Sequence, residues 1–62
     1  MENKLERILK QVRKFNSFEN ARSASHRFIK PARVLMGDDG RYWVTTIGEA
    51  SILEKAGYEI VY

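Results

Sequence analysis

The amino-acid sequence predicts an α+β fold in which helices pack on one face of a small three-stranded sheet, in the order α-α-β-β-α-β. Apolar residues recur at helical spacing through the first half of the chain, and after Pro31 the spacing changes to two, as in strands. A capped helical stretch then separates the last strand-like run from the two before it. The 62 residues leave room for one domain, 1–62, made of a basic helical half (1–30) and a hairpin-helix-strand unit (33–62).

Residues 2–15 predict an amphipathic helix. Lysines and arginines surround an apolar side whose members follow helical spacing. We expect this apolar side to be hidden in the fold and the cationic side to face solvent. The apolar side consists of Leu5, Ile8, Leu9, Val12 and Phe15.

A second helix is expected from about residue 17 to residue 26 or 27. Asn16 and Glu19 have the spacing of a capping box, which predicts a break between the two helices near Asn16 and Ser17. Pro31 lacks an amide hydrogen and disfavours a helical residue before it, so the helical half must end there. The apolar stripe of this helix comprises Phe18, Ala21, Ala24 and Phe28.

The stretch RVLMGDDGRYWVT, which begins at Arg33, predicts a β-hairpin. β-Branched and aromatic residues on both sides of GDDG follow the period of two that is typical of strands. Gly37 and Gly40 can supply the positive φ angles that hairpin turns require.

A capped helix and a last strand complete the expected fold. Thr46 and Glu49 form a second capping-box pattern, and Gly57 stands where a left-handed C-terminal cap is expected, with Tyr58 placed to pack on Leu53. YEIVY predicts the final strand, which lies either parallel to the second hairpin strand, through a right-handed crossover, or on the other edge of the sheet. A free strand edge there would be a template for a homodimer.

The segments GDDGRYWV and EASILEKAGYEIV, within residues 33–61, resemble a family of short uncharacterised bacterial proteins. These proteins carry a Gly-Asp-Asp-Gly turn, an aromatic second strand and an Ala-Gly-Tyr-Glu ending, as this sequence does. The resemblance implies a fold unit in a bacterial protein, and it implies no activity.

The composition excludes several classes of protein. The chain has no cysteine, which excludes a disulfide, a thiolate metal site and a cysteine nucleophile. Charges interrupt the N-terminal segment too often for a signal peptide, and no apolar run approaches the roughly 18 residues of a membrane span. We therefore expect a cytoplasmic protein with no membrane partner. Because so small a domain lies near the limit of independent stability, a homodimer or a bound partner is a reasonable expectation.

No residues combine into a catalytic or metal site. His26 is the only histidine, and it has Ser23 and Ser25 nearby in sequence but no acid to orient it. Asp38 and Asp39 are too few and too close together to hold a hard cation, and turn chemistry explains them. GDDG also lacks the lysine of a phosphate-binding loop. We predict a protein that is not an enzyme, with no catalytic residue, no metal and no cofactor.

Positive charge is concentrated in the first half of the chain. Residues 1–33 carry nine Lys or Arg against three Glu, whereas residues 34–62 carry two against five acidic residues. A basic half predicts an acidic partner, and cations on one surface would neutralise nucleic-acid phosphates without sequence specificity. The alternative is a solvated face that only keeps the protein soluble. The candidate phosphate contacts are Lys4, Arg7, Lys10, Arg13, Lys14, Arg22, Arg27 and Lys30, with Arg33 in the same basic half.

Aromatic residues of the strands form a second candidate surface. Trp43, Tyr58 and Tyr62 are candidates for an interface that stacks bases or joins two copies, and the alternative is that they fill the core. Because Tyr42 alternates with Trp43 along a strand, these two rings need not share a surface. The sequence therefore predicts a non-enzymatic binding or regulatory domain that contacts an acidic partner, nucleic acid in the first place. The alternative is a protein-interaction adaptor or homodimer that uses a strand edge or an aromatic face.

Overall fold

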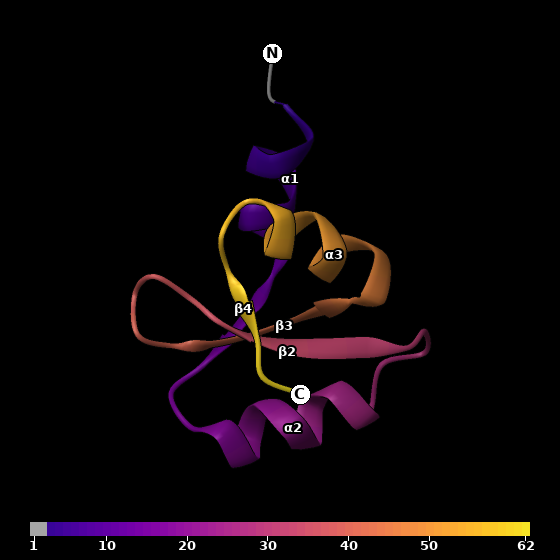
Figure 1. Cartoon of the computed structure of the whole chain (residues 1–62). Helices are drawn as coiled ribbons and strands as arrows, with labels where there is room; N and C mark the ends of the chain where they lie inside the picture. The colour runs from indigo at the N-terminus through magenta and orange to yellow at the C-terminus, as the bar shows by residue number, and fades with distance from the viewer. Residues whose placement is uncertain (1–2) are drawn as a thin grey trace.

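A computed structural model describes residues 3–62 of the chain, and these residues form four strands and three helices. The strands make one antiparallel sheet in the order β1-β3-β2-β4. Helix α2 lies on one face of this sheet, and α1 and α3 lie on the other (Figure 1). The elements are α1 (Lys4–Gln11), β1 (Arg13–Phe15), α2 (Phe18–His26), β2 (Ala32–Met36), β3 (Tyr42–Thr46), α3 (Ile47–Lys55) and β4 (Glu59–Ile60).

The predicted α+β class is confirmed, but the predicted three-stranded sheet is wrong because the first helix ends early. Helix α1 stops at Gln11, and the next residue, Val12, already has extended backbone angles. Residues 13–15 then pair with β3, with Arg13 opposite Val44 and Phe15 opposite Tyr42. Without β1, the backbone N–H and C=O groups on the free edge of β3 would have no strand partner. For residues 13–15, hydrogen bonding to β3 therefore stabilises the fold more than continuation of the helix would.

The second helix begins where the sequence predicts, with a different cap. The side chain of Ser17 accepts a hydrogen bond from the backbone N–H of Asn20 at 3.2 Å, so Ser17 is the N-cap and Asn16 precedes it. Helix α2 ends at His26, and Pro31 lies in the connection to β2 as expected. Among residues 3–62, no helix is long and apolar enough to cross a membrane.

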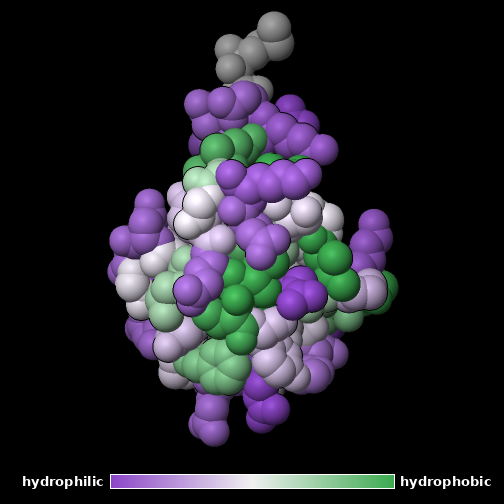
Figure 2. Space-filling model, in the orientation of Figure 1, coloured by the Kyte–Doolittle hydropathy of each residue, from purple (hydrophilic) through white to green (hydrophobic). Residues whose placement is uncertain are grey.

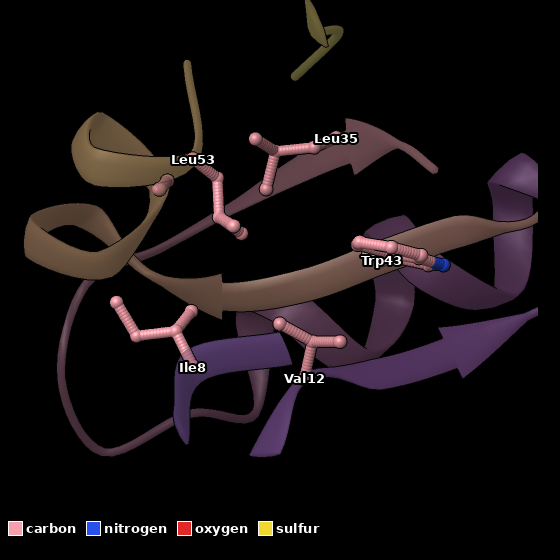
Figure 3. Close-up of a cluster of buried hydrophobic side chains, with 6 residues drawn as sticks. Ile8, Val12, Leu35, Trp43 and Leu53 are labelled. Atoms are coloured by element: carbon pink, nitrogen blue, oxygen red, sulfur yellow. The ribbon is translucent and has the colours of Figure 1, made fainter. Parts of the chain in front are cut away.

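The core is divided between the two faces of the sheet, because the central strands β2 and β3 are covered on both. Side chains of β2 and β3 alternate, so neighbouring residues enter opposite clusters. Helices therefore cover two faces, where one had been expected. On the α2 face the buried residues are Ala21, Val34 and Val44. On the other face they are Ile8, Val12, Leu35, Trp43, Ala50 and Leu53, which converge from α1, α3 and the two central strands (Figure 3).

The apolar side predicted for the first helix is hidden in this second cluster. Ile8 and Val12 are buried, and Leu5 and Leu9 pack against them half-buried. Phe15 departs from the predicted stripe, since β1 directs it to the α2 face instead. The cationic side of α1 faces solvent, as the amphipathic pattern requires.

The hairpin forms as predicted, although its two glycines serve different purposes. Gly40 has a φ of +80°, in the left-handed region. Gly37 does not have a positive φ; it is buried against the Trp43 indole, which leaves no space for a side chain. Gly37 therefore permits a close approach of the backbone to the Trp43 ring, because it has no side chain.

Both cap residues of α3 are as predicted, although the Glu49 carboxylate accepts a hydrogen bond from Thr45 Oγ1, a bond that a capping box does not include. Thr46 accepts a hydrogen bond from the N–H of Glu49. At the other end Gly57 has a φ of +109°, and the N–H of Tyr58 donates to the carbonyl of Leu53 at 3.1 Å, as in the Schellman motif. The turn sends β4 back along β2, antiparallel, with Ile60 opposite Leu35. The parallel alternative is wrong, and β4 is the edge strand opposite β1.

Candidate functional site

The fold separates the eight predicted cations into different regions of the surface, and all eight are exposed. Lys4, Arg7 and Lys10 lie along α1, which forms the hydrophilic upper end of the molecule in Figure 2. The remaining five lie on and around β1 and α2. Of these, Arg13, Arg27 and Lys30 come together at one groove, whereas Lys14 and Arg22 lie elsewhere.

Lys14 is occupied by the protein's own hairpin. Its Nζ lies 5.0 Å from the centroid of the Trp43 ring and 3.9 Å from Asp39 Oδ2. Asp39 also accepts hydrogen bonds from the N–H of Arg41 at 2.9 Å and from Trp43 Nε1 at 3.1 Å. Lys14 therefore closes the edge of the core above Trp43, and a phosphate would have to compete with Asp39 for it.

The contacts of Asp39 predict that the stability of the folded protein depends on pH in the acidic range. The hydrogen bond from the Arg41 N–H lowers the pKa of Asp39 below 3.8, with smaller effects from Trp43 and Lys14. A carboxylate whose pKa is lower in the folded state adds stability above its unfolded pKa, and that stability is lost as pH falls through the folded pKa. We expect the melting temperature of Asp39→Asn to fall less than that of the wild type between about pH 5 and pH 2. Thermal unfolding of both proteins across this range is the measurement, and parallel curves would contradict the assignment.

Arg22 and Tyr62 belong to a contact that fixes the C-terminus on α2. The Arg22 guanidinium lies 6.0 Å from the Tyr62 ring centroid, and the Tyr62 hydroxyl is 2.9 Å from His26 Nε2. Phe18 meets the same ring edge to face. Tyr62 remains 42% exposed, so it is accessible to a partner, and His26 has a role in holding the chain end.

Trp43 and Tyr58, the other predicted interface residues, are part of the fold. Trp43 is only 3% exposed, and its ring lies 5.1 Å from that of Tyr58. Partial burial, followed by the nearby charge of Asp38, raises the pKa of Tyr58, so the phenol stays neutral. Trp43 is thus a core residue that offers almost no surface to a partner, whereas Tyr58 is half-buried and Tyr62 is exposed.

A groove of about 740 Å³ lies beside the edge strand β1. Arg13 and Phe15 both project toward α2, because Lys14 between them points to the opposite face of the sheet. The flank of α2, the loop that follows it and the end of β3 form the rest of the wall. The lining residues are Arg13, Phe15, Asn20, Ser23, Ala24, Arg27, Phe28, Ile29, Lys30 and Thr46.

The electrostatics of the groove are one-sided. Within the described part of the chain, three cations and no carboxylate line it. The guanidinium of Arg13 lies 6.0 Å from the Phe28 ring centroid, and Arg27 donates to Ser23 Oγ at 3.4 Å. Neither contact neutralises a charge, so all three cations are available to an anion. Beside them lie the apolar lining residues, which we call the apolar floor of the groove: Phe15, Ala24, Phe28 and Ile29.

Sequence reasoning identified the three cations but not the neutral residues beside them. The sequence predicts a cap role for Thr46 and places Ser23 near His26, and it predicts no role for Asn20 or Ile29. A usable signal was present at Ile29, an apolar residue directly after Phe28 that continues past the last turn of the predicted helix. In the structure the Ile29 side chain is fully exposed.

A second, smaller hollow of about 390 Å³ lies at the opposite end of the strand order, between the hairpin turn and the start of β4. Its charged lining residues are Asp38 and Glu59. Across residues 3–62 there is no group of three or more histidine or acidic side chains that could hold a metal ion. Because both charged lining residues of this hollow are acidic, it would repel a phosphate.

Comparison with known proteins adds no relative: no protein-family model, curated protein or solved structure matches the chain.

Proposed function

We propose that the domain is a small non-enzymatic binding protein whose groove beside β1 contacts the phosphates of nucleic acid without reading their sequence. The observation that carries the proposal is the lining of this groove, in which Arg13, Arg27 and Lys30 converge with no described carboxylate among them. Lysines and arginines that neutralise phosphates release condensed counterions, which is the main source of non-specific affinity. The site thus uses three of the eight predicted cations.

A second candidate function, a protein-interaction adaptor or homodimer, is favoured by an apolar area on the opposite side. Figure 2 shows hydrophobic side chains gathered over β4 and α3, where Ile52 and Ile60 are half-buried. Addition of a strand at either sheet edge has less support. Edge strand β1 has three residues and β4 has two, and short edge strands resist pairing with another chain. Sedimentation at increasing protein concentration tests self-association.

The phosphate proposal predicts a specific salt dependence. Three phosphate contacts on a single strand give a slope of about −2 in log K against log salt, so affinity should fall about twentyfold between 50 and 200 mM salt. The triple variant R13Q/R27Q/K30Q should bind far more weakly and lose most of this slope. Fluorescence anisotropy of a labelled mixed-sequence oligonucleotide is the suitable measurement, because Trp43 is buried on the other face of the sheet.

A matched variant controls for overall charge. K4Q/R7Q/K55Q also removes three exposed cations, none of which lines the groove. It should retain most of the affinity and most of the salt slope. Equal losses in the two triple variants would show that charge alone, and not the groove, attracts the oligonucleotide, and no binding at 50 mM salt would refute the proposed function.

A further inference from the structure

An exposed apolar floor beside the three cations suggests what kind of nucleic acid fits the groove. Ile29, one of the residues that line the groove, is fully exposed. It lies between Phe28, whose ring is half-buried, and Lys30, one of the three cations. A surface that contacted only phosphates would gain nothing from Ile29, because apolar side chains make no favourable contact with an anion.

Aromatic and aliphatic surface bordered by cations is the combination that binds single strands. Bases that are not stacked in a duplex lie on aromatic rings or guanidinium planes, while lysines and arginines follow the backbone. The Arg13 guanidinium lies 6.0 Å from the centroid of the Phe28 ring, so the groove already combines a cation with an aromatic ring. In a duplex the base faces are covered by their neighbours, so only the phosphates would reach this floor.

The size and polar rim of the groove agree with a short nucleotide segment. Its volume of about 740 Å³ is within the range of sites for small organic ligands. Asn20, Ser23 and Thr46 carry hydrogen-bonding side chains around the apolar floor. Base edges present both donors and acceptors, so amide and hydroxyl groups can meet them without selecting one base.

We infer that the groove binds single-stranded nucleic acid, with an unstacked base against Phe28 and Ile29 and the flanking phosphates at Arg13, Arg27 and Lys30. This inference rests on the proposed function and specifies its ligand. An acidic peptide has matching charge but a poorer fit. A peptide would bind best as an added strand, and β1 offers only three residues for such pairing.

Three labelled ligands of equal phosphate number separate base contact from phosphate contact: a single strand, a fully abasic strand and a duplex. Stacking on an aromatic side chain changes affinity about 5- to 150-fold for each base. The single strand should therefore bind at least about fivefold more tightly than the abasic strand and the duplex, in anisotropy titrations at one salt concentration. Equal affinities for the single and abasic strands would overturn the inference and leave phosphate binding intact. No binding of any oligonucleotide would refute the proposed function as well.

The variant Ile29→Ser tests the floor directly without disturbing the core. It should weaken binding of the single strand about fivefold, because apolar contact between Ile29 and the base is lost, and leave binding of the abasic strand unchanged. Ile47→Ser is the matched control, because Ile47 is also an exposed isoleucine and does not line the groove. Loss of affinity for both ligands in Ile29→Ser, or equal loss in both variants, would overturn the inference. A glutamate-rich peptide that bound more tightly than the single strand would overturn it too, and would assign the groove to a protein partner.

Discussion

Replacement of Leu35 by alanine is expected to lower the free energy of unfolding by about 2–5 kcal/mol. Leu35 is fully buried on the central strand β2, where it packs with Trp43 and Leu53 (Figure 3). The change removes apolar contacts and leaves a cavity that the flanking strands prevent from closing. A domain of 62 residues has a total stability of roughly 3–9 kcal/mol, so this variant should lose a large part of it and can unfold outright.

Urea denaturation followed by circular dichroism measures the Leu35→Ala effect, and Trp43 fluorescence reports on the same cluster. Ile47→Ala is the control, since Ile47 is 47% exposed and its truncation should change stability by no more than about 0.5 kcal/mol. If the two variants had the same midpoint, Leu35 would not be at the centre of the core.

Local signals in the second half of the chain were sufficient to predict its elements. Thr46 and Gly57 act through contacts within a few residues of themselves, so their caps can be recognised from sequence spacing alone. The same holds for the hairpin, whose strands are adjacent in sequence. The sequence leaves the position of β4 open because either edge of the sheet satisfies its alternating pattern, and only pairing with β2 distinguishes the two edges.

The candidate site was harder to predict because it depends on where α1 ends. In residues 12–15 the two apolar residues stand three apart, which fits one side of a helix. A strand places them on opposite faces, and this is favourable only because both faces of the sheet are covered. Pairing of Arg13 with Val44 decides between them, and this contact is distant in sequence. As a strand, the segment sends Arg13 toward α2 and Lys14 to the opposite face, so the continuous basic helix became separate charged regions. The groove is a consequence of that register, and its polar neutral residues Asn20, Ser23 and Thr46 carry no sequence signal that would place them there.

The second large effect is expected at Gly37, where alanine should destabilise the domain by about 1–3 kcal/mol. A Cβ atom there would come within 2.6 Å of Trp43 Cζ2, and closer still to Cε2 and Nε1. Neither the Gly37 backbone nor the Trp43 ring can move easily. The Gly37 N–H is held by the carbonyl of Arg41 at 2.8 Å, and the indole is fixed by its hydrogen bond to Asp39. The ring must therefore leave its position or the hairpin must open, and either movement exposes apolar surface.

The Gly37→Ala variant should show a shifted Trp43 emission spectrum together with a lower urea midpoint. Gly48→Ala is the matched control, because nothing lies within 4 Å of a Cβ at that position in α3 and its backbone is helical. Alanine there should be neutral or stabilising by up to about 1 kcal/mol. Opposite signs for the same chemical change would establish that Gly37 is required for space and not for chain flexibility. A Gly37→Ala protein as stable as the wild type, with unchanged emission, would mean that Trp43 does not rest on this backbone, and the closure of the core by Lys14 and Asp39 would then lose its support.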